Sequence, residues 1–168
     1  SVTSSIGTAK NLVSITPTRT PGEYDVVYDV HVTNLGNFPI SNVQVIDSLN
    51  YINGLANVVS ASAAMQSNPG GLSINPAYNG TTNATLLIPG QTLKNFPVAE
   101  NNVVIRISAR ISNVIQGQIY NNSAVATGIG FSALPIRDSS ANGLNADLNL
   151  NEIADDPGEN NPTPFVIT

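Results

Sequence analysis

The sequence predicts an all-β domain, and three observations support that prediction. Apolar and polar residues alternate over residues 23–34 and 102–111, which is the period of a half-buried strand. Turn-forming Asn-Gly and Pro-Gly pairs divide the chain into short segments. Almost nothing between these turns has the apolar spacing of a helix. The 168 residues are enough for one domain with a buried core.

The N-terminal third is expected to hold three strands. Residues 1–9 have the composition of a polar leader or linker, and residues 10–16 form a first short strand that Pro17 ends. The second strand covers residues 23–34, and its buried face carries alternating apolar side chains, namely Tyr24, Val26, Tyr28, Val30 and Val32. The third strand covers residues 42–49, and its inward face carries Val43, Val45, Asp47 and Leu49. This register points an aspartate into the core.

The rest of the chain continues as short strands. They are expected over residues 55–64, 83–88, 102–111, 118–130 and 163–168, with an Asn53-Gly54 turn before the first of them. Seven to nine strands at this spacing predict an immunoglobulin-like Greek-key β-sandwich. Its body would span residues 10–137, and a long acidic loop over residues 138–162 would precede the closing strand, residues 163–168.

Residues 138–162, called the acidic segment below, contain no Lys or Arg. Because carboxylates repel one another at this density, a folded loop of this kind requires a cation, and oxygen ligands of Asp and Asn select calcium. Calcium is therefore the expected cofactor, as a structural ion. Nine residues are the expected ligands: Asp138, Ser140, Asn142, Asp147, Asn149, Asn151, Asp155, Asp156 and Glu159.

The spacing of these ligands partly follows the EF-hand loop. Asp138, Ser140 and Asn142 stand at positions 1, 3 and 5, with Gly143 at position 6, and the same 1, 3, 5 spacing starts again at Asp147. The first loop lacks Glu at position 12 and the second lacks Gly at position 6, so we expect irregular calcium loops. A solvated, flexible connector of the same composition is the alternative.

Three motifs carry a resemblance to a known family. They are the tyrosine-led run Tyr28–Gly36 with its Thr-Asn-x-Gly ending, the valine-rich run Val43–Leu49 closing on Asp-x-Leu, and Asn122–Ala124. The chain resembles the conserved repeat domain of unknown function that occurs in tandem in bacterial cell-surface proteins. Its acidic segment is similar to the calcium-type connector of large Bacteroidetes-like adhesins. The resemblance implies an immunoglobulin-like module that spaces or displays other domains.

Immunoglobulin-like surface modules of this kind sometimes carry a spontaneous amide bond between a Lys of the first strand and an Asn of a late strand. Lys10, Asp47 and Asn122 occupy suitable places for such an isopeptide cross-link. Burial would favour the neutral forms of the lysine and of the aspartic acid that promotes the reaction. Alternatively, Lys10 lies in solvent at a strand end and Asp47 caps a turn.

Composition and motifs limit the other functions. The net charge is -5 and only 10% of the residues are charged, so no basic surface for nucleic acid or anionic lipid is present. No cysteine is available for a disulfide, and no run is long enough for a membrane helix. No catalytic motif occurs, and the single histidine, His31, lies on the exposed face of a strand. We therefore expect no enzymatic activity.

Two functions remain open from the sequence. The first is a structural or adhesive module of a secreted surface protein or fibre, outside the cell, whose partners are neighbouring copies or adjacent domains; its last strand could be exchanged between subunits. The second is a carbohydrate-binding or accessory module of a secreted enzyme, with a glycan or host-surface ligand. Tyr51 and Tyr78 are the loop aromatics to test for such a ligand.

Overall fold

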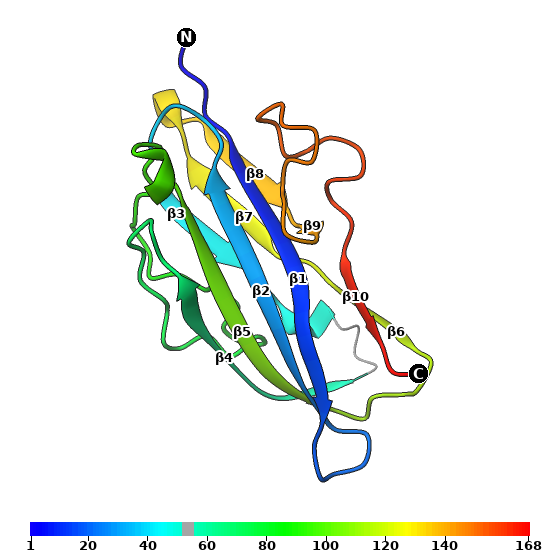
Figure 1. Cartoon of the computed structure of the whole chain (residues 1–168). Coiled ribbons are helices and arrows are strands. Elements are labelled where there is room, and N and C mark those ends of the chain that lie inside the picture. Colours follow the sequence, from blue (N-terminus) through cyan, green and yellow to red (C-terminus); the bar gives the residue numbers. More distant parts are fainter. Residues whose placement is uncertain (52–55) are drawn as a thin grey trace.

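The computed structural model describes residues 1–51 and 56–168, and the chain is all-β, as the sequence predicts (Figure 1). Ten strands occur in this part of the chain, against the seven to nine expected. They are β1 (Ile6–Pro17), β2 (Tyr24–Asn34), β3 (Ser41–Ile46), β4 (Asn57–Ser67), β5 (Asn102–Ser112), β6 (Ile119–Asn122), β7 (Val125–Ile129), β8 (Pro135–Ser139), β9 (Ala141–Asn142) and β10 (Thr163–Val166). Short 3-10 turns cover Leu49–Tyr51, Val98–Glu100 and Phe131–Ala133.

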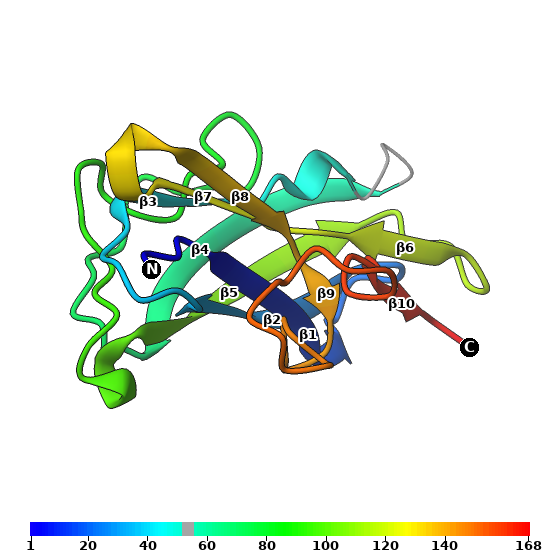
Figure 2. The ribbon, with the colours of Figure 1, turned by 90° about the horizontal axis from the view of Figure 1, so that it is seen from above.

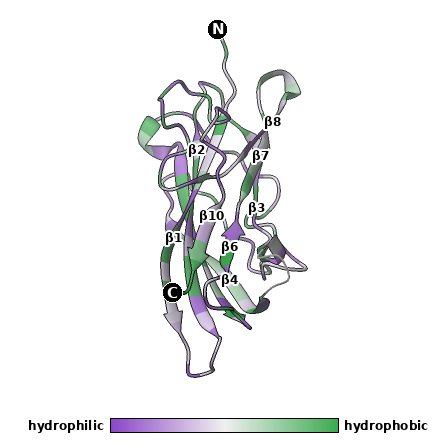
Figure 3. Cartoon of the chain, turned by 90° about the vertical axis from the view of Figure 1, so that its right-hand side faces the viewer, coloured by the Kyte–Doolittle hydropathy of each residue, from purple (hydrophilic) through white to green (hydrophobic). Residues whose placement is uncertain are grey.

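The strands form the two layers of a sandwich (Figure 2). One layer is a five-stranded sheet in the order β4-β5-β2-β1-β9. The other layer contains a three-stranded sheet, β3-β7-β8, and a two-stranded sheet of β10 and β6, which lie side by side in Figure 3. The short β9 pairs in parallel with β1, whereas β1 pairs with β2 and β2 with β5 in antiparallel fashion.

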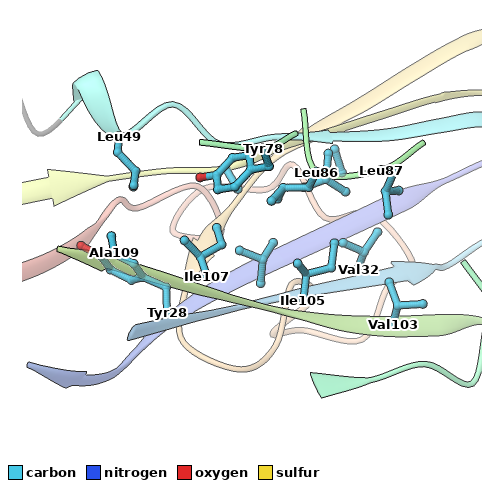
Figure 4. Packing of buried hydrophobic residues seen from close by; sticks show 14 of the residues in the cluster. Tyr28, Val32, Leu49, Tyr78, Leu86, Leu87, Val103, Ile105, Ile107 and Ala109 are labelled. Atoms are coloured by element: carbon cyan, nitrogen blue, oxygen red, sulfur yellow. The ribbon is translucent and has the colours of Figure 1, made fainter. Parts of the chain in front are cut away.

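The main core lies between these two layers and consists of aliphatic side chains with three buried tyrosines and Phe165. Figure 4 shows part of this packing. Alternation on β2 and β5 supplies much of it, because one face of each strand points inward and the other carries charged residues. On the outer face, the carboxylate of Asp29 accepts two hydrogen bonds from the Arg106 guanidinium, and Asp25 pairs with Arg110 in the same way. The predicted faces of both strands are therefore confirmed.

The acidic segment is an excursion between two strands that pair with one continuous stretch of chain. β8 runs antiparallel to β7 and ends with Ser139 opposite Val125. β10 runs antiparallel to β6 and begins with Thr163 opposite Asn122, so the ladder resumes three positions further on. The chain between them forms β9 and then irregular turns beside β1 (Figure 1). The closing strand predicted at residues 163–168 is therefore present, paired within its own chain.

A second, smaller core attaches the acidic segment to the outer face of β1. Buried Ala9 of β1 packs with three alanines that follow β8, namely Ala141, Ala146 and Ala154, and Leu35 packs against this cluster. A Cβ atom on Gly7 would lie 2.8 Å from Leu35 Cδ1 and 2.9 Å from Ala146 Cβ, so the close packing requires a glycine there. The segment is a packed part of the domain and differs in this from a free connector.

Several predicted boundaries are corrected by the structure. The first strand begins at Ile6, so the leader is shorter than the predicted residues 1–9. The start of β1 lacks a clear alternation, because small residues such as Gly7 allow both of its faces to be buried. Residues 83–88 form no strand and make only isolated bridges, for example between Ile46 and Thr85. No strand was predicted for residues 135–137, and the acidic loop was predicted to begin at Asp138, whereas β8 covers Pro135–Ser139 and pairs with β7. The predicted Asn53-Gly54 turn and the strand start at Leu55 lie outside the described residues.

Candidate cross-link site

Lys10 is a fully buried lysine on the core-facing side of β1. Ile6, Thr8 and Lys10 alternate along the strand and share this side, which faces the opposite layer of the sandwich. The side chain of Lys10 has a relative exposure of 0%, and its Nζ lies 4.1 Å from the centre of the Tyr28 ring. A lysine at 0% exposure requires partners in the core, because desolvation of an unpaired ammonium is costly.

Two polar side chains of the opposite layer meet Lys10. Asp47 directly follows β3 and lies with its Oδ2 atom 2.6 Å from Lys10 Nζ. Asn122 ends β6, and its Oδ1 atom accepts a hydrogen bond from the same Nζ. The Nδ2 atom of Asn122 donates to the carbonyl oxygen of Ser48 at 3.0 Å, which fixes the orientation of the amide plane. The structure thus brings together the three residues that the sequence analysis selected.

Burial determines the protonation of this cluster. Desolvation lowers the pKa of the Lys10 ammonium, and the nearby Asp47 only partly offsets this effect. Desolvation likewise raises the pKa of the Asp47 carboxyl, against the opposing effect of Lys10. Both shifts favour a neutral amine beside a protonated carboxylic acid. The Oδ1 atom of Asp47 is buried without a hydrogen-bond partner among the described residues, which adds to the cost of a charged carboxylate there.

Two tyrosines close the apolar surroundings of the cluster. Tyr28 lies beneath the lysine, and burial raises the pKa of its phenol, so the ring stays uncharged. The hydroxyl group of Tyr78 donates to the backbone carbonyl of Asp47 at 2.9 Å and helps to hold the residue in place. Tyr78, one of the two loop aromatics selected as candidates for sugar contact, is buried and offers no exposed ring face for stacking. The side chain of Tyr51, the other candidate, lies outside the described residues.

The arrangement matches the requirements of amide-bond formation between Lys10 and Asn122. A neutral Nζ is a nucleophile, and the side-chain carbonyl of Asn122 is the electrophile within contact distance. Asp47 contacts the attacking amine, and a carboxylic acid at this position can exchange protons with it. Water is excluded, because all three residues have 0% exposure.

The predicted calcium ligands occupy several different environments. Asp138 belongs to β8, where its Oδ2 accepts the backbone N–H of Thr8 at 2.8 Å. The hydroxyl of Ser140 accepts the N–H of Ala124 at 2.9 Å, and Asn142 lies in β9 opposite Lys10. These first three positions of the EF-hand-like spacing therefore lie in strands or between them. Their side chains or backbones already make contacts with other strands of the sandwich.

The later acidic residues hold the turns of the acidic segment. The two carboxylate oxygens of Asp147 accept backbone N–H groups of Asn151 and Glu152, and those of Glu159 accept Leu148 and Asp156. The Oδ2 atom of Asp156 accepts the side-chain amides of Asn149 and Asn151, at 2.9 and 2.6 Å. These two hydrogen bonds lower the pKa of the Asp156 carboxyl. The Oδ1 atom of Asp155 accepts a bond from Asn160.

The fit of calcium to this segment follows from these contacts. Within residues 1–51 and 56–168, no three or more His, Cys, Asp or Glu side chains gather into a group able to hold a metal ion. The carboxylates instead act as acceptors for nearby amides. Calcium binding by the acidic segment stays a prediction, and any site would need carbonyl and Asn oxygens to supplement single carboxylates.

His31, the single histidine of the chain, lies on β2. Its Nε2 atom lies 2.7 Å from Asn11 Oδ1 of β1, and partial burial lowers the pKa of the imidazole. The described part of the chain contains no helix that is both long and apolar enough to cross a membrane.

Sequence reasoning missed two contacts of the cross-link site. The Ser48 carbonyl that orients Asn122 belongs to the backbone, and its position depends on the bend after β3. Thr163, which contacts the backbone of Lys10, gave no signal because its role depends on a strand that returns 153 residues later in the chain. Only the placement of a threonine at the start of the closing strand could have drawn attention to it.

Comparison with known proteins gives structural similarity only. No protein-family model matches the chain, and no curated protein matches it. Among solved structures, the N-terminal domain of PorA covers 82% of the chain over 96% of its own length, with 6% identity and a TM-score of 0.40. The major pilin subunit of Bacillus cereus, BcpA, covers 82% of the chain with 12% identity and a TM-score of 0.40. The chain spans 38% of the length of that pilin.

Proposed function

We propose that this domain is a non-catalytic structural module of an extracellular bacterial surface protein or fibre, locked internally by an isopeptide bond between Lys10 and Asn122. The observation that carries the proposal is the buried contact of Lys10 with Asn122 and Asp47. The cluster links β1 of one layer to β6 of the other, so one bond would clamp the two sheets together.

The bond forms without any external reagent. The Lys10 Nζ attacks Cγ of Asn122, the new N–C bond forms, and the Cγ–Nδ2 bond breaks. Protonated Asp47 gives its proton to the leaving nitrogen and takes one from the attacking amine, so it is unchanged at the end. The leaving group is ammonia. The cross-linked chain is therefore lighter than the sequence mass by one ammonia.

A cross-link at this position suits a protein that bears tension. Lys10 and Asn122 are 112 residues apart in sequence. The N-terminus and the C-terminus lie toward opposite ends of the sandwich (Figure 1). A pulling force applied at the two ends would pass from residues 1–10 through the amide bond to residues 122–168. The core strands between the two cross-linked residues would then carry no load.

The position also supplies covalent stability in a chain that has no cysteine. In the chain-entropy treatment, closing a loop of about 100 residues restricts the unfolded state by roughly 4 to 5 kcal/mol. Neighbouring copies or adjacent domains of the same surface protein would be the partners of such a module. The alternative of a carbohydrate-binding module gains no support from Tyr78, since that residue is buried.

Intact-mass measurement of the purified chain tests the proposal. The wild-type chain should lack one ammonia, and Lys10→Ala and Asp47→Asn should each retain the full mass. Asp25→Asn is the matched control, because Asp25 pairs with Arg110 on the exposed outer face, and it should lose ammonia like the wild type. A folded wild-type chain of full mass would refute the cross-link.

A further inference from the structure

The backbone carbonyl of Lys10 is held by the part of the chain that follows β8. The hydroxyl of Thr163 donates to this oxygen at 2.7 Å, and the N–H of Gly143 donates to it at 2.9 Å. In addition, Asn142 of β9 stands opposite Lys10 in the parallel pair. The position of the reactive lysine on β1 is thus fixed from one side by β2 and from the other side by the acidic segment and β10.

Thr163 also stands opposite the second reactive residue. In the antiparallel pair of β10 and β6, Thr163 is the partner of Asn122. The threonine has a relative exposure of 1%. Thr163 therefore contacts both reacting residues through their backbones. Its hydroxyl donates to the carbonyl of Lys10, and its own backbone lies opposite Asn122 in the strand pair.

We propose that Thr163 is a positioning residue for the cross-link, and that docking of β10 brings Lys10 and Asn122 into reactive contact. The inference rests on the proposed function, since it concerns the same amide bond. Thr163 touches neither the attacking Nζ nor the carbonyl that is attacked. It acts by setting the separation of the two strands on which these groups are carried.

The consequence is an order of events during folding. β1 contains Lys10 and β6 contains Asn122, but the ladder that holds Asn122 in place is completed only when residues 163–166 pair with β6. The amide bond then forms after the last strand has docked, and it locks a finished sandwich. A chain that has not docked its last strand stays open and able to refold.

The geometry supplies the expected size of the effect. A misplacement of about 1 Å at a reacting centre slows a reaction by up to about 100-fold. Removal of the Thr163 hydroxyl leaves Gly143 as a donor to the Lys10 carbonyl, so the loss of positioning is partial. We expect the rate of ammonia loss to fall by at least about tenfold in Thr163→Val.

The test follows ammonia loss by intact mass in samples taken at intervals after cell-free synthesis of the full chain. Thr163→Val keeps the shape of the side chain and removes the hydroxyl, whereas Thr163→Ser keeps the hydroxyl and should restore the wild-type rate. The matched control is Thr8→Val: Thr8 is buried on β1 two residues from Lys10, and its hydroxyl has no partner among the described residues. Thr8→Val should react at the wild-type rate.

The outcomes separate this inference from the proposed function. A wild-type chain that never loses ammonia refutes the cross-link and the role of Thr163 with it. A wild-type chain that reacts, together with a folded Thr163→Val that reacts equally fast, refutes the role of Thr163 alone. Slow reaction of both Thr163→Val and Thr8→Val would assign the effect to general loss of core packing and would also overturn it. Should Thr163→Val fail to fold, Thr163→Ala replaces it, and a folded Thr163→Ala at the wild-type rate is equally contradictory.

Discussion

Lys10 and Asn122 face each other across the sandwich, one on the first strand and one at the end of β6, with neither side chain exposed. This contact joins the two layers, and the residues between the two positions in sequence make up most of the core.

The first prediction concerns extension under force. When single molecules are pulled by their two ends, the wild-type chain should extend less than Lys10→Ala by roughly 390 Å, since each of the 112 residues of separation contributes about 3.5 Å when stretched. Atomic force measurement of the contour length gives this difference directly. Equal extension of the two chains would show that no covalent bond carries the load.

The second prediction concerns stability. Asn122→Ala removes the amide of the proposed cross-link, so the free energy of unfolding should fall by at least about 4 kcal/mol, the value for restricting a loop of this length. Urea denaturation measures the change. The matched control is Asn121→Ala, since Asn121 is exposed on the same strand, and we expect it to change the stability by less than about 0.5 kcal/mol. A loss for Asn122→Ala as small as that of the control would contradict the prediction.

The third prediction concerns pH and Asp138. Burial, followed by the charges of Asp155 and Glu159, raises the pKa of this carboxyl to about 7, although the Thr8 N–H and Arg137 act in the opposite direction. The folded chain therefore holds a proton that the unfolded chain releases above its ordinary pKa of 3.8. Stability from this group is complete at low pH and is lost as the pH rises from about 4 to about 7.

Asp138→Asn should remove this pH dependence. The amide can still accept the Thr8 N–H, and it carries no charge to desolvate. We expect the variant to exceed the wild type in stability by about 2 to 3 kcal/mol at pH 8 and by little at pH 4. Asp25→Asn provides a control of opposite sign, because the Arg110 hydrogen bonds lower the pKa of Asp25. If the difference in stability between Asp138→Asn and the wild type is the same at pH 4 and pH 8, the raised pKa of Asp138 is contradicted.

The fourth prediction concerns calcium. At a free calcium concentration about 100 times the dissociation constant, binding would stabilise the folded chain by about 2.7 kcal/mol and raise its melting temperature. Melting curves in calcium, in magnesium and in chelator compare the three states. Asp155→Asn and Asp156→Asn should reduce the calcium effect. Identical curves in calcium and chelator would leave the alanine cluster and the amide contacts as the basis of order in the acidic segment.

Part of the fold could be predicted because strand alternation is a local signal. β2 and β5 each bury one face, so Val30 and Ile105 could be assigned to the core from spacing alone. β1 and β8 could not be bounded in this way. Both faces of β1 are covered near Ala9, and β8 contains few apolar residues, so neither strand alternates clearly.

The candidate site was partly predictable for a similar reason. Asp47 could be identified as buried because it shares the parity of Val43 and Val45. The calcium spacing was less informative, since Asp138 and Ser140 are also alternate positions of a strand and its continuation. Thr163 could be located only as the first residue of the closing strand, because its contact with Lys10 depends on tertiary packing.

The excursion between β8 and β10 also bears on how such a domain can diversify. Its ends lie at neighbouring ladder positions, Ser139 opposite Val125 and Thr163 opposite Asn122, so the entry and exit of the loop are close together. Loops of this kind tolerate changes of length at small entropic cost, since the register of the flanking strands stays the same. A related domain could thus carry a segment of different length or sequence between Ser139 and Thr163. The proposed cross-link would be retained, provided that the new loop restores the hydrogen bonds that Gly143 and Thr163 donate to the Lys10 carbonyl.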